Sequence, residues 1–103
     1  MIKVIYAMVN NEMPEDFVDD LFFAEGEYEI MLFDSPIIAE VNGEMQEFPE
    51  HHCILYKPGQ HIHYRAKSGK LLYTWIRFNC DEALFTEGYI PFGVPVFCPD
   101  FGC

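Results

Sequence analysis

The sequence predicts an all-β domain in which short strands form a barrel or a sandwich. Runs rich in β-branched and aromatic residues recur about every 8–12 residues, and a turn signal follows each run. No helical pattern alternates with these runs, which argues against βαβ units. With 103 residues, half of them hydrophobic, the chain can bury one core, so we expect a single domain over residues 1–103.

The N-terminal segment carries the weakest pattern. Residues 1–9 alternate only weakly and fit either an arm or a first strand. Phe17 and Leu21 have a helical spacing within residues 14–23, which also contain four acidic residues, so a short helix and an irregular acidic arm both fit. We expect residues 1–23 to form an irregular arm.

The strand pattern is clear in the middle of the chain, and we expect a barrel core over residues 28–79. Asn42-Gly43 is a two-residue hairpin signal, and Pro58-Gly59 and Ser68-Gly69 mark further turns. The expected strands cover residues 28–33, 37–41, 44–48, 51–56, 60–66 and 71–78.

The last segment, residues 80–103, is expected to be irregular. Residues 88–103 contain three of the seven prolines and four aromatic residues, a composition that excludes a regular helix.

Charge and hydropathy restrict the partners and the location. Six basic and seventeen acidic residues give a net charge of −11, so the surface field should repel a phosphate backbone. No apolar run approaches the roughly 20 residues of a membrane span, and the start lacks the apolar stretch of a signal peptide. We therefore expect a cytoplasmic protein that does not contact a membrane and does not bind DNA by itself.

The residues that could carry catalysis or hold a metal do not form a recognisable set. His61 and His63 share a strand face, but the hairpin over residues 37–48 has no histidine to complete a three-ligand face with a carboxylate. The serines, threonines and cysteines do not stand in nucleophile motifs. We expect no metal, no cofactor, no catalytic residue and no enzymatic activity.

Aromatic residues on two neighbouring strands point to a ligand site. Alternation places Tyr73, Trp75 and Arg77 on one strand face, and Ile62 and Tyr64 on one face of the preceding strand. An indole, two phenols and a guanidinium suit a small-molecule site with apolar walls and a few polar groups, although the same aromatic residues could simply fill a core. The candidate ligand-binding residues are Ile62, Tyr64, Tyr73, Trp75, Arg77, Phe33 and Met31.

A family resemblance rests on the strand, Pro-Gly turn and aromatic strand of residues 53–64, followed by Trp75-Ile76-Arg77-Phe78. This order resembles the N-terminal, cupin-like sensor domain of AraC-type transcription regulators. The resemblance implies a jelly-roll barrel with the ligand inside, and Tyr64 and Trp75 match ligand-contact positions of sugar-binding members. Residues 28–33 differ from those members because they contain no basic residue to hold a pentose.

The resemblance also implies a function and further parts. We expect an effector-binding domain that senses a carbohydrate-like molecule and pairs with a second copy, while DNA is bound by a C-terminal helix-turn-helix domain that this sequence lacks. On this view the sequence is a fragment that ends before that domain. Two alternatives remain: a stand-alone cupin enzyme, which would need a metal, and a structural dimerisation module, whose barrel would be filled by side chains.

Overall fold

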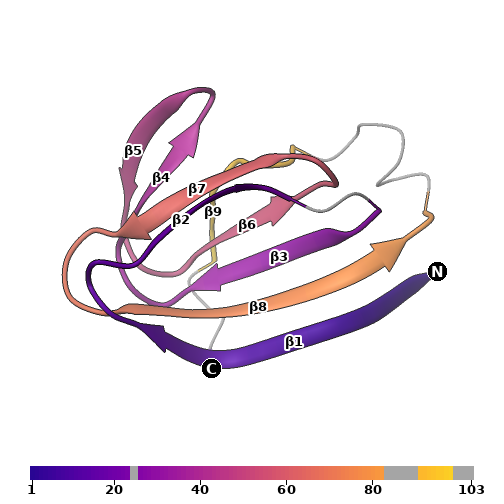
Figure 1. Cartoon of the computed structure of the whole chain (residues 1–103), viewed down its shortest axis with the longest axis horizontal. Helices are drawn as coiled ribbons and strands as arrows, with labels where there is room; N and C mark the ends of the chain where they lie inside the picture. The colour runs from indigo at the N-terminus through magenta and orange to yellow at the C-terminus, as the bar shows by residue number, and fades with distance from the viewer. Residues whose placement is uncertain (24–25, 83–90, 99–103) are drawn as a thin grey trace.

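A computed structural model of the chain describes residues 1–23, 26–82 and 91–98. Two antiparallel sheets pack face to face (Figure 1), with strand orders β1-β8-β3-β6-β9 and β2-β7-β4-β5. The described residues contain strands, turns and bends but no helix, so the all-β prediction is confirmed. The strands are β1 (Ile2–Met13), β2 (Val18–Phe22), β3 (Tyr28–Phe33), β4 (Ile37–Val41), β5 (Glu44–Phe48), β6 (His52–Tyr56), β7 (His61–Ala66), β8 (Leu71–Cys80) and β9 (Val96–Phe97).

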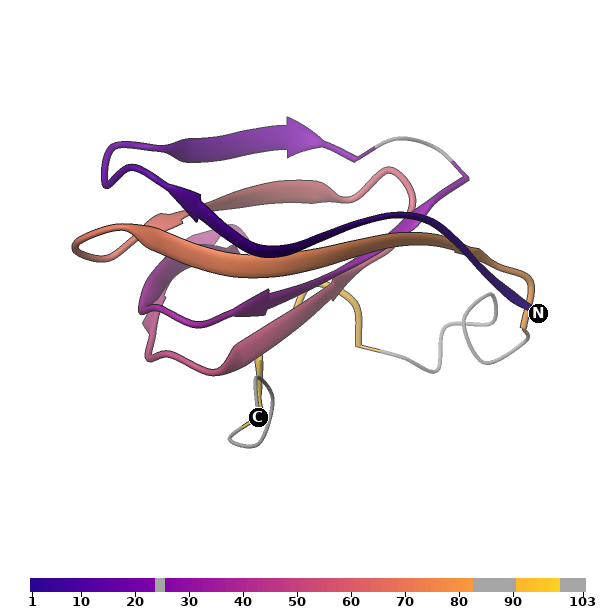
Figure 2. The ribbon, with the colours of Figure 1, turned by 90° about the horizontal axis from the view of Figure 1, so that it is seen from below.

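The irregular arm expected over residues 1–23 is wrong, because most of this segment is in strands. β1 pairs with β8 from Ile2↔Cys80 to Met13↔Leu71, with two register shifts, and β2 pairs with β7. Figure 2 shows indigo β1 running alongside orange β8. β1 lies at a sheet edge and is largely exposed, so burial imposes little alternation on its sequence.

A single turn separates β1 from β2. The amide of Phe17 donates a hydrogen bond to the carbonyl of Pro14 at 3.0 Å, which closes a single turn. The chain then enters β2 in the opposite sheet. Phe17 and Leu21, whose spacing allowed a short helix, therefore lie at the end of this turn and within β2, and residues 14–23 contain no helix.

The strands expected between residues 28 and 79 are confirmed within one or two residues at their ends, and β8 extends to Cys80. Asn42 and Gly43 both have positive φ, 54° and 83°, as the hairpin turn between β4 and β5 requires. The prediction succeeded here because turn chemistry and alternation are local signals.

Residues 80–103 were expected to be irregular throughout, and one part of this expectation is wrong. Residues 91–98 include the two-residue strand β9, in which Phe97 pairs with His52 of β6. Residues 83–90 and 99–103 lie outside the described residues.

The hydrophobic core lies between the two sheets. Phe33, Ile37 and Leu71 are completely buried, and Ile54, Ile62 and Tyr64 are nearly so. These side chains come from both sheets, so their burial holds the layers together.

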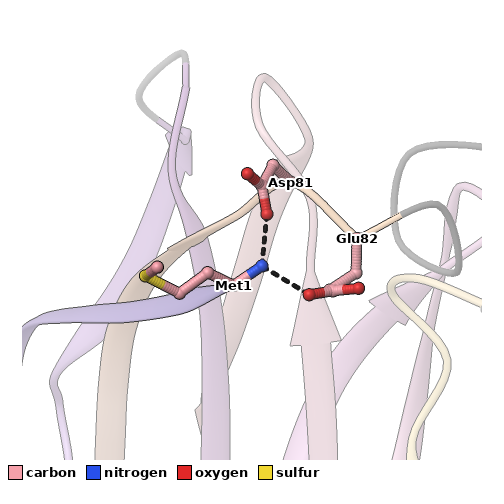
Figure 3. Close-up of polar contacts among 3 residues, drawn as sticks. All are labelled: Met1, Asp81 and Glu82. Carbon is pink, nitrogen blue, oxygen red and sulfur yellow. Dashed lines mark hydrogen bonds and ion pairs between the residues drawn. The ribbon is translucent and has the colours of Figure 1, made fainter.

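Polar contacts join the start of β1 to the end of β8. The amino group of Met1 contacts the carboxylates of Asp81 and Glu82, as Figure 3 shows. Hydrogen bonds to these carboxylates raise the pKa of the Met1 amino group to about 10.

Within the part of the chain that the structure describes, no helix is long and apolar enough to cross a membrane.

Candidate functional site

A cavity of about 140 Å³ opens between the two sheets. It brings together six of the seven predicted ligand-binding residues: Met31, Ile62, Tyr64, Tyr73, Trp75 and Arg77. Its other lining residues are Asp19, Leu21, Phe23 and Glu29.

Phe33, the seventh predicted residue, does not line this cavity. Its completely buried ring makes an edge contact with Tyr64, with centroids 5.0 Å apart, and stacks with Tyr73 at 6.1 Å. Phe33 therefore supports the two tyrosines from within the core.

Strand pairing explains why these side chains meet. Met31 of β3 is the register partner of Trp75 in β8, and Glu29 is the partner of Arg77. Paired residues share a sheet face, so both pairs point into the cavity.

The second sheet closes the cavity in the same way. Asp19 of β2 pairs with Tyr64 of β7, and Leu21 pairs with Ile62. The predicted parity of Ile62 and Tyr64 holds, since both are buried while His61 and His63, which alternate with them, are partly exposed.

Trp75 is a half-buried residue of the cavity wall. Its indole stacks on the ring of Tyr6 from β1, with centroids 5.3 Å apart and an interplanar angle of 28°. The guanidinium of Arg77 lies 5.4 Å from the indole centroid and 4.9 Å from the ring of Phe23. These cation–π contacts hold Arg77 beside the aromatic wall.

Glu29 places a buried carboxyl in the cavity. Only 6% of the residue is exposed, and desolvation raises its pKa to about 7 although Arg77 acts in the opposite direction. Oε1 of Glu29 lies 3.6 Å from Nη2 of Arg77. Glu29 therefore changes its charge near neutral pH.

Arg77 has donor capacity that the described residues do not use. Its Nε is buried and donates no hydrogen bond to any of them, since Oε2 of Glu27, at 3.7 Å, is too distant.

Tyr64 and Tyr73 keep their phenol protons. Burial raises the pKa of both groups, so each hydroxyl can donate and accept a hydrogen bond. Their rings meet edge to face with centroids 6.2 Å apart. Together with Asp19, Glu29 and Arg77, they surround an apolar wall with groups able to bind hydroxyls.

Sequence reasoning missed four lining residues. Asp19, Leu21 and Phe23 belong to the segment that we expected to be an irregular arm, and only the distant pairing of β2 with β7 brings Asp19 and Leu21 to the cavity. Glu29 could have been found, because it stands two residues before Met31 on the same face of a predicted strand.

A second cluster lies on the outer face of the smaller sheet. One potential ligand atom from each of Asp20, His61 and His63 lies within 4.8 Å of the others. Hydrogen bonding to Asp20 raises the pKa of His61 and lowers that of Asp20. A carboxylate from β2 therefore meets the two histidines, an arrangement that was not anticipated from the sequence.

Comparisons with known proteins identify the fold. No protein-family model and no curated protein matches the chain. Among solved structures, it is similar to the cupin_2 domain of an XRE family transcriptional regulator from Enterobacter cloacae, with a TM-score of 0.54 and 10% identity. This match covers 80% of the chain and 97% of that domain.

A de novo designed double-stranded β-helix gives a TM-score of 0.42 and 8% identity, covering 73% of the chain and 97% of the design. The likeness to the cupin_2 domain confirms the predicted cupin-like jelly-roll fold.

Proposed function

We propose that the chain is the effector-binding domain of a transcription regulator and binds a carbohydrate-like molecule between its two sheets. The observation that carries this proposal is the convergence of Tyr64, Tyr73, Trp75 and Arg77 on one cavity. These residues come from two strands, and they were selected from strand alternation, residue type and the family resemblance.

The volume favours a small ligand. A cavity of about 150 Å³ is known to hold benzene, so about 140 Å³ accommodates roughly one six-membered ring. A monosaccharide or a smaller polyol is compatible with this size, with part of the molecule at the half-buried rim near Trp75.

The lining chemistry favours a neutral polyhydroxylated molecule. The indole of Trp75 offers a flat apolar surface for the face of a sugar ring, and the polar groups of Asp19, Glu29 and Arg77 can bind its hydroxyls. Two carboxyl groups against one guanidinium disfavour an anionic ligand.

The regulatory part of the proposal rests on two similarities. The cupin_2 neighbour belongs to a transcriptional regulator, and residues 28–78 resemble an AraC-type sensor domain. Because the net charge is −11, we assign DNA binding to a separate basic domain and expect this domain to pair with a second copy.

Binding can act on the N-terminal strands. Leu21 and Asp19 of β2 line the cavity, and Tyr6 of β1 packs on Trp75. A ligand that favours one arrangement of these strands would shift the population of regulator states. The proposal therefore assigns the domain a signalling role rather than a catalytic one.

A thermal-shift screen tests the proposal. Neutral aldopentoses, aldohexoses and polyols form one panel, and cationic amines and anionic sugar phosphates form two others. A ligand specific for the folded state raises the melting temperature as its concentration rises. We expect shifts only from the neutral panel. A shift produced only by amines or phosphates, or by no compound, would contradict the proposal.

A pair of conservative variants locates the binding. Tyr64→Phe removes a hydroxyl from the cavity, whereas Tyr56→Phe removes one from a similarly buried tyrosine that does not line it. The sugar-induced shift should fall in Tyr64→Phe and persist in Tyr56→Phe. Equal shifts in both variants would place the ligand elsewhere.

A further inference from the structure

The outer face of the smaller sheet carries two histidines from one strand. His61 and His63 of β7 point away from the cavity, because Ile62 and Tyr64 occupy the inward positions. Their ring centroids are 5.8 Å apart, which is close enough for both imidazoles to reach a common point.

Asp20 of β2 joins these histidines through strand pairing. It is the register partner of His63 and therefore lies on the same outer face. Its Oδ1 lies 2.7 Å from Nε2 of His61, and its Oδ2 lies 3.9 Å from Nε2 of His63.

We propose that His61, His63 and Asp20 form a binding site for a divalent transition-metal ion of the zinc type. Two imidazole nitrogens and a carboxylate oxygen are a donor set that Zn²⁺ accepts, with water completing the coordination. Ligand atoms around tetrahedral Zn²⁺ stand about 3.3 Å apart, given metal–ligand bonds of about 2.0–2.1 Å. The three donors lie within 4.8 Å of one another, so side-chain rotation is sufficient to bring them to a metal.

Glu40 of β4 supports the choice of ligand atom. Its Oε2 lies 2.6 Å from Nδ1 of His61, an ion-pair contact without hydrogen-bond geometry, while Nε2 of the same ring faces Asp20. A carboxylate next to the second nitrogen of a ligating histidine is the usual outer partner in such sites, and Glu40 lies in this position. The ring of Phe22 stacks on His61 with centroids 4.9 Å apart and further restricts its rotation.

This site is separate from the cavity and independent of the proposed carbohydrate. Asp20 and His63 face outward, whereas their neighbours Asp19 and Tyr64 face the cavity. A metal on Asp20 and His63 would join β2 to β7 and stabilise the strand that carries Asp19.

Calorimetric titration of Zn²⁺ tests the proposal. The full chain is used without a polyhistidine tag, after dialysis against a chelator and then against chelator-free buffer. We expect one Zn²⁺ per chain and a rise in melting temperature on addition of Zn²⁺. The absence of saturable binding at micromolar Zn²⁺ would overturn the proposal.

Asparagine variants identify the ligands. His61→Asn, His63→Asn and Asp20→Asn should each weaken Zn²⁺ binding at least tenfold, and Glu40→Gln should weaken it roughly 10–100-fold. His51→Asn is the matched control, because His51 also faces a carboxylate, with Nδ1 3.8 Å from Oδ1 of Asp34, and has a positive φ that asparagine tolerates.

The control variant should bind Zn²⁺ like the parent chain. Circular dichroism verifies that each variant is folded, and the exposed Asp20 provides a test even if a histidine variant unfolds. Unchanged affinity in the His61→Asn/His63→Asn double variant, or in folded Asp20→Asn, would overturn the proposal.

Discussion

Arg77 and Glu29 are register partners in β8 and β3, and Nη2 of Arg77 lies 3.6 Å from Oε1 of Glu29. Both side chains line the cavity between the sheets. Burial raises the pKa of Glu29 to about 7, while the Arg77 charge opposes this rise without cancelling it. The carboxyl therefore ionises inside the cavity close to neutral pH.

Glu29 should make stability depend on pH. Its folded-state pKa of about 7 lies above its ordinary value of 4.5, so the folded state holds the proton more tightly. The stability linked to this proton is fully present below pH 4.5 and is lost as pH rises through about 7. Glu29→Gln should therefore gain stability relative to the parent chain as pH rises.

Urea unfolding of both chains at pH 5.5 and pH 8.5 measures this effect. The difference in unfolding free energy between Glu29→Gln and the parent should be more favourable to the variant at the higher pH. A difference that stays constant, or that changes in the opposite direction, would show that Glu29 does not have a raised pKa.

Ser35→Ala should destabilise the fold through one lost acceptor. The buried Ser35 hydroxyl accepts a hydrogen bond from the Leu72 amide at 3.0 Å. An unsatisfied buried amide costs about 1–3 kcal/mol. Urea unfolding measures the loss, and exposed Ser68→Ala is the control, expected within about 0.5 kcal/mol of the parent. Equal stability of the two variants would refute this role for Ser35.

Phe33→Ala should be among the most destabilising single changes. The Phe33 ring is completely buried and packs against Tyr64 and Tyr73, so its removal leaves a hole under the cavity. Phenylalanine-to-alanine changes in cores cost about 3–5 kcal/mol. Phe22→Ala, at a position 75% exposed, should cost far less in metal-free buffer. Similar unfolding midpoints for the two variants would be incompatible with this packing.

Cys53 should react slowly with alkylating reagents at neutral pH. Burial and the Cys98 thiol, whose Sγ lies 3.3 Å away, raise the pKa of Cys53 to about 11. Because the thiolate is the nucleophile, the rate with iodoacetamide should be lower in the folded chain than in urea and should increase as pH approaches 11. Peptide mapping by mass spectrometry measures both rates, and equal rates would contradict the prediction.

The sequence predicts the central strands well because their signals are local. Alternation and turn residues locate β3 to β8, and the hairpin at Asn42-Gly43 has the backbone conformation that its residues favour. Parity within β7 and β8, together with the family resemblance, selected Tyr64, Tyr73 and Trp75, which meet at the cavity from opposite sheets. Parity shows which face of a strand a side chain occupies, but not whether its position along the strand reaches the cavity. Phe33 was therefore assigned to the site, although its ring packs beneath the cavity against Tyr64.

The remaining features depend on pairing between distant segments. Asp19 reaches the cavity, and Asp20 reaches His61 across 41 residues of sequence, only because β2 pairs with β7. The alternating strand pattern is weak in both segments, because β2 contains acidic residues and β1 lies at an exposed sheet edge. No local rule specifies such a register, so the outer histidine–carboxylate cluster could not be found from spacing.

A carbohydrate that binds beside Trp75 provides the most direct test of the proposed function. Trp75 is the single tryptophan of the chain, so its fluorescence reports on the cavity without a label. Titration with the neutral sugar found by thermal shift should change this fluorescence in a saturable way. Calorimetry should then show that Trp75→Ala binds roughly tenfold to a hundredfold more weakly, a loss of about 1–3 kcal/mol. Unchanged fluorescence at saturation, or equal affinity of parent and Trp75→Ala, would contradict a ligand site in this cavity.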